Sequence, residues 1–226
     1  MRALPAALQA EFRGTAADLE QLDRAAYKTA HRDPLEPILG LGPATAPVAF
    51  FGRDPGRDEV MHGVPFIGAG GRHVRRVLSA RQGGGDLSST EQAQRVGEPY
   101  FWANTVPYKP IANKAWSMAV KRRFQPLVAR VLCELWQQTD IITLGREAFL
   151  WFGIHQPRAL GERLQQHWAA PERFSTAIAC DYQSPRGVTR HLRLHPLPHP
   201  SPLNATWFKR FPGLLEARLN QLALAQ

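Results

Sequence analysis

The sequence predicts an α/β protein, a three-layer α/β/α sandwich with a central four-stranded parallel sheet. Three short segments rich in apolar residues favour strands at residues 48–51, 100–106 and 140–144, and an alternating segment favours a fourth strand at 191–197. Segments of helical character lie between these runs, and strands that alternate with helices are typical of a parallel sheet covered on both faces. The first run, Val48-Ala49-Phe50-Phe51, contains no polar residue. A strand buried on both of its faces is expected to have this composition.

The segments between the predicted strands account for the helical layers and the loops. Residues 1–30 are dominated by Ala, Leu, Glu and Gln at helical spacing and predict a helical region. Residues 81–97 are rich in Gly, Ser and Gln, so we expect a surface insertion there. Further helices are expected at residues 72–80, 124–138, 146–152 and 206–224.

The length of the chain suits one domain. A chain of 226 residues with 44% hydrophobic side chains can bury a full core. Neither an internal repeat nor a second boundary is evident. We therefore expect a single domain over residues 1–226, with an N-terminal helical extension and loop at 1–46 and a core at 47–215.

Composition narrows the class of partner and the compartment. The 28 Lys and Arg exceed the 19 Asp and Glu and give a net charge of +9, which favours a polyanion such as nucleic acid. A generally basic protein is the plainer alternative. The two cysteines, Cys133 and Cys180, form no CxxC pair, so neither a disulfide framework nor a zinc or iron–sulfur site is expected. The two lone cysteines favour a reducing compartment, the cytoplasm. Neither a signal-peptide pattern nor an apolar stretch long enough for a membrane span is expected.

Three segments at the ends of predicted strands contain polar side chains that could bind a ligand or take part in catalysis. In open parallel sheets, ligands bind at the carboxyl ends of the strands. Residues 52–71, GRDPGRDEVMHGVPFIGAGG, combine an acidic residue with glycines that allow close backbone approach and prolines that stiffen the loop. The segment lacks the spacing of phosphate-binding loops. A tight turn with a capping Asp is the structural alternative.

The other two segments contribute an amide and a histidine. Asn104 ends the second strand, and its side chain offers both a donor and an acceptor for a base edge. An Asn that bonds only its own loop would look the same. Residues 198–204 present His199, Ser201 and Leu203 on a loop stiffened by two prolines. A histidine after a strand is often structural, and an ordinary buried leucine is the alternative for Leu203.

Taken together, these motifs resemble the uracil-DNA glycosylase superfamily. GRDPG is similar to its first motif, PFIGAGG to the continuation found in branches that carry an iron–sulfur cluster, and HPSPLN to its second motif. The resemblance spans roughly residues 47–215. It implies a monomer without metal or other cofactor that removes uracil from DNA and so starts base excision repair.

The resemblance also implies roles for individual residues. Asp54 would activate water and stabilise the sugar cation, and His199 would stabilise the departing uracil anion. Uracil would be held by Gly52, Arg53, Phe66 and Asn104, with Phe66 stacking on the flipped base and Asn104 reading its edge. DNA contacts are expected from Ser201, from Leu203 as a wedge in the base stack, and from Lys121, Arg122 and Arg123.

The sequence combines features of different branches of the superfamily and matches none of them completely. Asp54 matches the uracil-specific branch, whereas Arg53 stands where the iron–sulfur branches have a Glu, and their four cluster cysteines are absent. Gly56 replaces the Tyr that excludes the methyl group of thymine. KRRFQ, residues 121–125, is similar to a loop that traps uracil-DNA covalently, but Gln125 replaces the trapping histidine, so trapping is not carried over.

Two other functions remain open at this stage. An α/β hydrolase acting on nucleotides or sugar phosphates would require phosphate-loop or metal-ligand residues after the first strand, and the sequence lacks them. A protein that binds or traps uracil or another lesion without cutting would share the motifs. The presence of both Asp54 and His199 favours catalysis.

Overall fold

A five-stranded sheet forms the centre of the protein. The computed structural model describes residues 3–222. The strands are β1 (Val48–Gly52), β2 (Phe101–Asn104), β3 (Asp140–Leu144), β4 (Ile178–Gln183) and β5 (Thr189–Leu197), in the order β2-β1-β3-β5-β4. β1, β2, β3 and β5 pair in parallel, and β4 pairs antiparallel to β5. The α/β class is confirmed, and the four parallel strands are the predicted ones.

The prediction of four strands was wrong, because it omitted the edge strand β4. Its residues alternate strictly between buried and exposed, with Ile178, Cys180 and Tyr182 facing inward. This alternation is typical of an antiparallel edge strand with one solvated face. The continuous apolar runs that mark the central strands are therefore missing from β4.

The helices fall close to the predicted segments, with different boundaries. α1 (Ala6–Ala16) and α2 (Arg24–Thr29) share the predicted N-terminal region. The other helices near predicted positions are α4 (Ala69–Arg81), α6 (Met118–Glu134), α7 (Arg146–Leu150), α9 (Ala205–Phe208) and α10 (Phe211–Gln221). The last residues of the predicted C-terminal helix lie outside the described chain. Two helices, α3 (Arg57–His62) and α8 (Arg158–Ala169), lie where the sequence predicted no helix or strand.

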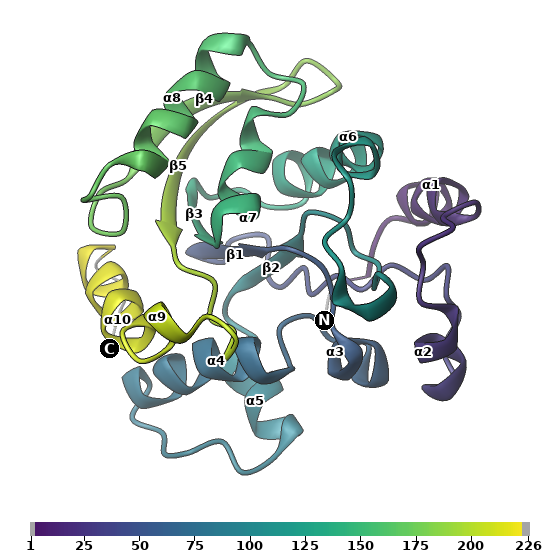
Figure 1. Ribbon diagram of the computed structural model, residues 1–226, viewed down its shortest axis with the longest axis horizontal. Coiled ribbons are helices and arrows are strands. Elements are labelled where there is room, and N and C mark those ends of the chain that lie inside the picture. Colours follow the sequence, from purple (N-terminus) through teal and green to yellow (C-terminus); the bar gives the residue numbers. More distant parts are fainter. Residues whose placement is uncertain (1–2, 223–226) are drawn as a thin grey trace.

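Helices cover both faces of the sheet (Figure 1). Along β1, Ala49 and Phe51 pack with α1, α6, α7 and α8, whereas Val48 and Phe50 pack with α4 and α10. The two apolar clusters lie on opposite faces because successive side chains of a strand point to opposite sides. The three-layer arrangement thus follows from continuous apolar strands. Within residues 3–222, no helix is both long and apolar enough to cross a membrane.

The predicted surface insertion at residues 81–97 is only half correct. Its second half forms α5 (Thr90–Gly97), which begins with a capping box in which Ser89 accepts a hydrogen bond from the Gln92 amide at 3.2 Å. α5 packs on α4 and buries Ala93. The Gly- and Ser-rich composition masked a short helix, because most of its residues are polar and few face the core.

Candidate active site

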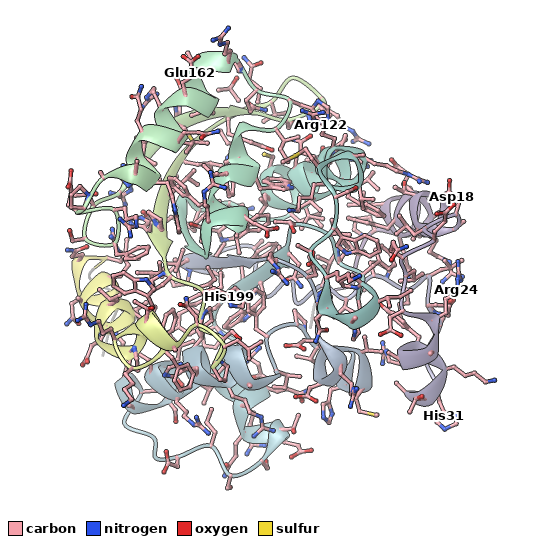
Figure 2. The ribbon with its side chains drawn as sticks, in the orientation of Figure 1. Asp18, Arg24, His31, Arg122, Glu162 and His199 are labelled. Carbon is pink, nitrogen blue, oxygen red and sulfur yellow. The ribbon has the colours of Figure 1, made fainter. Side chains whose placement is uncertain are left out.

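A cavity of about 690 Å³ opens at the carboxyl ends of the parallel strands. The loops after β1, β2 and β5 line it, as the strand-end rule predicts. It brings together eight of the predicted site residues: Gly52, Arg53, Asp54, Phe66, Asn104, His199, Ser201 and Leu203. In Figure 2, His199 lies near the middle of the molecule, on the segment that leaves β5.

Asp54 is an unusually isolated carboxylate. Its side chain is 2% exposed, and the nearest cation is the Arg53 Nε, 3.5 Å from Oδ2. Within residues 3–222, neither carboxylate oxygen of Asp54 has a hydrogen-bond partner of normal geometry, and the neighbouring Thr105 hydroxyl donates to the Arg53 carbonyl at 3.1 Å instead. Burial, with a smaller contribution from the Glu147 charge, raises the pKa of Asp54 to about 7 against the opposing effects of Arg53, Lys121 and the Thr105 hydroxyl. A desolvated carboxylate of this kind interacts strongly with any positive charge that forms beside it.

His199 is held as a neutral ring. Its Nδ1 accepts a hydrogen bond from the Ser201 amide at 3.3 Å, so the ring proton resides on Nε2. Burial, with a further contribution from the Arg53 charge, lowers the pKa of His199 to about 4. At neutral pH the side chain is therefore an uncharged hydrogen-bond donor through Nε2.

Asn104 ends β2 directly beside Gly52 of β1, its partner in the parallel ladder. The side chain is 3% exposed, and its Oδ1 is buried without a partner in the described part of the chain. Buried amide oxygens are normally hydrogen-bonded, so an orphaned acceptor needs an explanation. Because Asn104 lines the cavity, the simplest explanation is that its Oδ1 accepts a hydrogen bond from a ligand bound there.

Phe66 lies over the end of β1. A Cβ atom built on Gly52 would come within 2.6 Å of the Phe66 ring, so only glycine permits this approach. A Cβ on Gly71 would meet the Phe66 carbonyl oxygen at 2.0 Å. Phe66 itself has a φ of 56°, a left-handed conformation that non-glycine residues rarely adopt. The glycines of GRDPG and PFIGAGG thus create room for an aromatic platform.

The loop after β5 holds its own shape. The Leu203 amide donates to Ser201 Oγ at 3.2 Å, and Asn204 Nδ2 donates to the His199 carbonyl at 3.1 Å. The Leu203 side chain is 95% exposed. The buried-leucine alternative is therefore wrong.

Two carboxylates near the cavity lie outside the set of predicted site residues. Glu59 accepts hydrogen bonds from the Gly56 and Gly68 amides, each at 2.9 Å, and so joins the two ends of the first loop. A Glu three residues after the N-cap of a helix often accepts a hydrogen bond from the N-cap amide, as Glu59 does from Gly56. Glu147, in α7, pairs with Lys121 and lies 3.9 Å from Arg53. Only the fold brings Glu147 to this edge.

The basic run 121–123 lies in α6 and does not contribute to the residues described as lining the cavity. Lys121 is buried against Glu147, Arg123 pairs with Asp18 at 2.5 Å, and Arg122 is exposed, well away from His199 in Figure 2. DNA contact by these residues stays a prediction. Gln125 is buried and donates to the Tyr182 hydroxyl, away from the cavity.

The residues that line the cavity include three carboxylates, side-chain amides and a neutral imidazole, but they do not form a metal-binding group. Across the described residues, no set of three or more His, Cys, Asp and Glu side chains is arranged to hold a metal ion. Cys133 and Cys180 are both buried as free thiols.

Comparison with protein-family models assigns the chain to a family. The family model described as the uracil DNA glycosylase superfamily matches residues 39–223, a span that includes all three loops of the cavity. No curated protein matches the chain.

Proposed function

Because the chain belongs to the uracil DNA glycosylase superfamily, whose members are typically DNA glycosylases, we propose that it hydrolyses the bond between uracil and deoxyribose in DNA. The observation that carries the proposal is the pairing of a buried carboxylate, Asp54, with a neutral histidine, His199, in one cavity. Such a pair suits a reaction that separates charge between a sugar and its base.

The base must first leave the duplex, since the bond to be cut is inaccessible inside the stack. The net charge of +9 favours contact with phosphates, and the exposed Leu203 is suited to fill the gap that the base leaves. The flipped uracil stacks on Phe66. The free Oδ1 of Asn104 then accepts the N3–H of uracil, which selects against cytosine because cytosine has no proton on N3.

Cleavage breaks the N1–C1′ bond, and both electrons leave with uracil. Positive charge develops on the sugar and is stabilised by the Asp54 carboxylate, as in glycoside hydrolysis. Negative charge develops on uracil O2, to which His199 Nε2–H donates a hydrogen bond without giving up its proton. A water molecule oriented by Asp54 adds its oxygen to C1′. One of its protons passes to Asp54, and uracil leaves as an anion.

The proposal extends to the protein's state and place of action. We propose that it acts as a monomer in a reducing compartment such as the cytoplasm, in keeping with its two buried free thiols.

The deciding experiment incubates the protein with an oligonucleotide that contains one uracil and then cleaves abasic sites with alkali. Strand breaks at the uracil position support the proposal. A shifted but intact oligonucleotide would indicate a protein that binds uracil-DNA without cutting it. Asp58→Asn is the matched control for Asp54→Asn, because Asp58 is a second carboxylate of the same cavity wall and is exposed.

A further inference from the structure

The platform that carries Phe66 is held from behind by a buried arginine. Arg75, in α4, is 2% exposed. Its Nε donates to the Phe66 carbonyl at 2.8 Å, and its Nη2 donates to the Pro65 carbonyl at 3.1 Å. Two consecutive carbonyls of the cavity loop are therefore bound by one planar guanidinium group.

The same guanidinium is fixed to two other elements. Its Nη1 donates to the Ala93 carbonyl of α5 at 2.7 Å. Its carbon lies 4.3 Å from the ring centre of Trp102 in β2, a cation–π contact. The Trp102 ring centre lies 5.2 Å from that of Phe66. Arg75 thus connects the loop, α5 and the sheet, and the ring under Arg75 supports the ring of Phe66.

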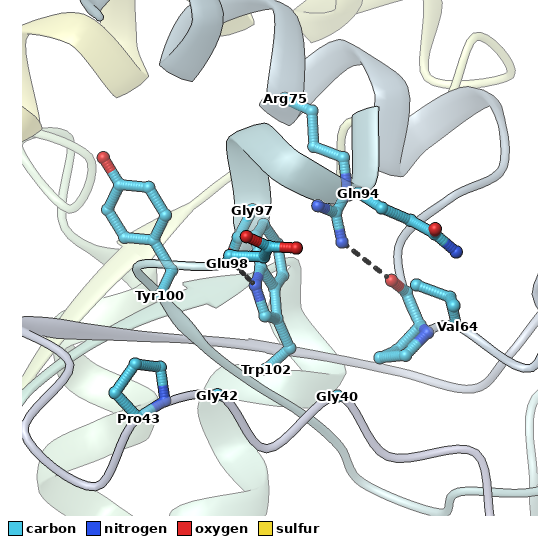
Figure 3. Close-up of a pocket in the computed structure, with 11 residues that line it drawn as sticks. Gly40, Gly42, Pro43, Val64, Arg75, Gln94, Gly97, Glu98, Tyr100 and Trp102 are labelled. Atoms are coloured by element: carbon cyan, nitrogen blue, oxygen red, sulfur yellow. Dashed lines mark hydrogen bonds between the residues drawn. The ribbon is translucent and has the colours of Figure 1, made fainter. Parts of the chain in front are cut away.

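The space around Arg75 explains why such a link is needed. Arg75, Pro65 and Trp102 line a second cavity of about 440 Å³. Figure 3 shows Arg75 and Trp102 at the wall of this cavity. Without Arg75, the Pro65–Phe66 turn would have room to retreat into this cavity. The left-handed backbone of Phe66, at φ 56°, would also lose the bond that favours it.

We infer that Arg75 is a positioning residue that holds the Pro65–Phe66 turn and thereby keeps the Phe66 ring where the flipped base stacks. The inference rests on the proposed uracil excision. Burying a guanidinium among neutral carbonyls is costly, and an apolar side chain could fill the space more cheaply. The three fixed donors of arginine are what the geometry uses, because a lysine ammonium cannot reproduce the planar fork.

The first test compares kcat and KM for uracil-containing oligonucleotide among the wild type, Arg75→Lys and Arg75→Met. We expect Arg75→Met to lower kcat/KM about 10- to 100-fold, mainly through kcat, since misplacing a stacking group affects the reacting geometry. Arg75→Lys should fall between the two. Arg75→Met activity within twofold of the wild type would overturn the inference.

A double-mutant cycle separates positioning from general stability. If Arg75 acts through Phe66, Arg75→Met should cost less than threefold once Phe66 is already replaced by leucine. Losses that multiply would show independent action and contradict the inference. Arg218→Lys is the matched control, because Arg218 is also buried and donates to the Phe174 and Thr176 carbonyls, but ties α10 to that segment instead. It should lower the melting temperature and leave kcat/KM within twofold.

A measurement that does not depend on enzymatic activity distinguishes a failure of this inference from a failure of the proposed function. Hydrogen exchange of the amides of residues 66–71 should speed up in Arg75→Lys and remain unchanged in Arg218→Lys. If the wild type does not excise uracil, the proposed function fails, and the exchange measurement still tests whether Arg75 holds the Pro65–Phe66 turn. Unchanged exchange in Arg75→Lys would overturn the inference.

A second variant, at Gly97, disturbs the same Arg75 contacts and serves in case Arg75→Met does not fold. A Cβ on Gly97 would lie 1.7 Å from Arg75 Nη1, so Gly97→Ala should displace the guanidinium and produce the same loss of kcat and the same faster exchange. Normal kcat and normal exchange in Gly97→Ala would contradict the inference.

Discussion

Two of the three loops that line the cavity are held in different ways. The loop after β1, residues 52–71, is held by bonds that span it or come from other elements: Glu59 joins Gly56 to Gly68, and Arg75 of α4 binds Pro65 and Phe66. The loop after β5, residues 198–204, is closed by bonds among its own residues.

This difference matches what each loop presents. The first loop carries a buried carboxylate and an aromatic platform, and small displacements of such groups are costly for reaction geometry. The second loop carries Leu203 in solvent, and such a residue is free to enter a base stack. The Phe66 platform is thus held by Arg75 from outside its loop, whereas His199 and Leu203 are positioned by bonds within theirs.

The largest expected effect concerns the charge of the first loop. Asp54→Asn should lower the excision rate by about 100-fold or more, because the carboxylate supplies several kcal/mol to the barrier. Single-turnover excision measures this loss, and Asp58→Asn should remain near wild type. Excision by Asp54→Asn at nearly the wild-type rate would move the catalytic role to another carboxylate.

The same variant should be more stable than the wild type at pH 8. The pKa of Asp54 is raised from 3.8 to about 7, so the folded state binds the proton more tightly than the unfolded state. Ionised Asp54 therefore destabilises the fold above about pH 7, and this cost disappears toward pH 4. We expect Asp54→Asn to gain about 1–3 kcal/mol in unfolding free energy at pH 8 and nothing near pH 4. Denaturant titrations at both pH values test this expectation, and an equal gain at both would contradict it.

The pH dependence of the wild type should follow the same group. Excision requires ionised Asp54, so kcat/KM should rise about tenfold per pH unit up to about pH 7 and then level off. His199, with its pKa lowered to about 4, stays neutral throughout this range and should add no second step. A profile that is flat between pH 5 and pH 8 would show that Asp54 is ionised throughout. In Asp54→Asn, the residual activity should lack the rise.

A smaller effect is expected from the second loop. Leu203→Ala should lower excision from duplex DNA about tenfold and from single-stranded DNA much less, because only a duplex has a stack to fill. Its stability should change by less than about 0.5 kcal/mol, because the side chain is already in water. Met118→Ala, at another exposed apolar residue, is the control. Equal losses on both substrates would argue against a wedge.

The smallest effect concerns selectivity at Gly56. The wild type should excise some 5-substituted uracils, such as 5-hydroxymethyluracil, because no side chain projects from this position, and packing against one methyl group discriminates by only about 1–3 kcal/mol. Gly56→Tyr should restore stricter selectivity for uracil, measured as the ratio of kcat/KM values on uracil, 5-hydroxymethyluracil and thymine opposite guanine.

Gly56→Ala is the matched control for that substitution. A Cβ on Gly56 would meet Glu59 Oε2 at 2.7 Å, so both variants displace the same carboxylate, but only Tyr adds a ring. If the wild type already rejects every 5-substituted base and Gly56→Tyr changes nothing, the position does not form the wall.

Much of the site could be predicted from local pattern. Asp54, Asn104 and His199 each follow an apolar strand, and the carboxyl ends of parallel strands meet at one edge of the sheet. A sequence therefore determines that such residues converge once the strands are recognised. The glycines around Phe66 belong to the same class of information, since each is required by a close approach within one segment.

Only the tertiary structure decided the properties that depend on residues distant in the chain. The sequence does not reveal that Asp54 is isolated from hydrogen-bond donors, since burial is a property of the packed fold. Lys121 was expected to bind DNA but is buried beside Glu147, 26 residues away. Arg75 reads as one more surface arginine of a basic helix, yet α5 and Trp102 enclose it. The physical reason is that local periodicity specifies which face of an element is apolar, whereas the partner of each polar group is set by where the other elements pack.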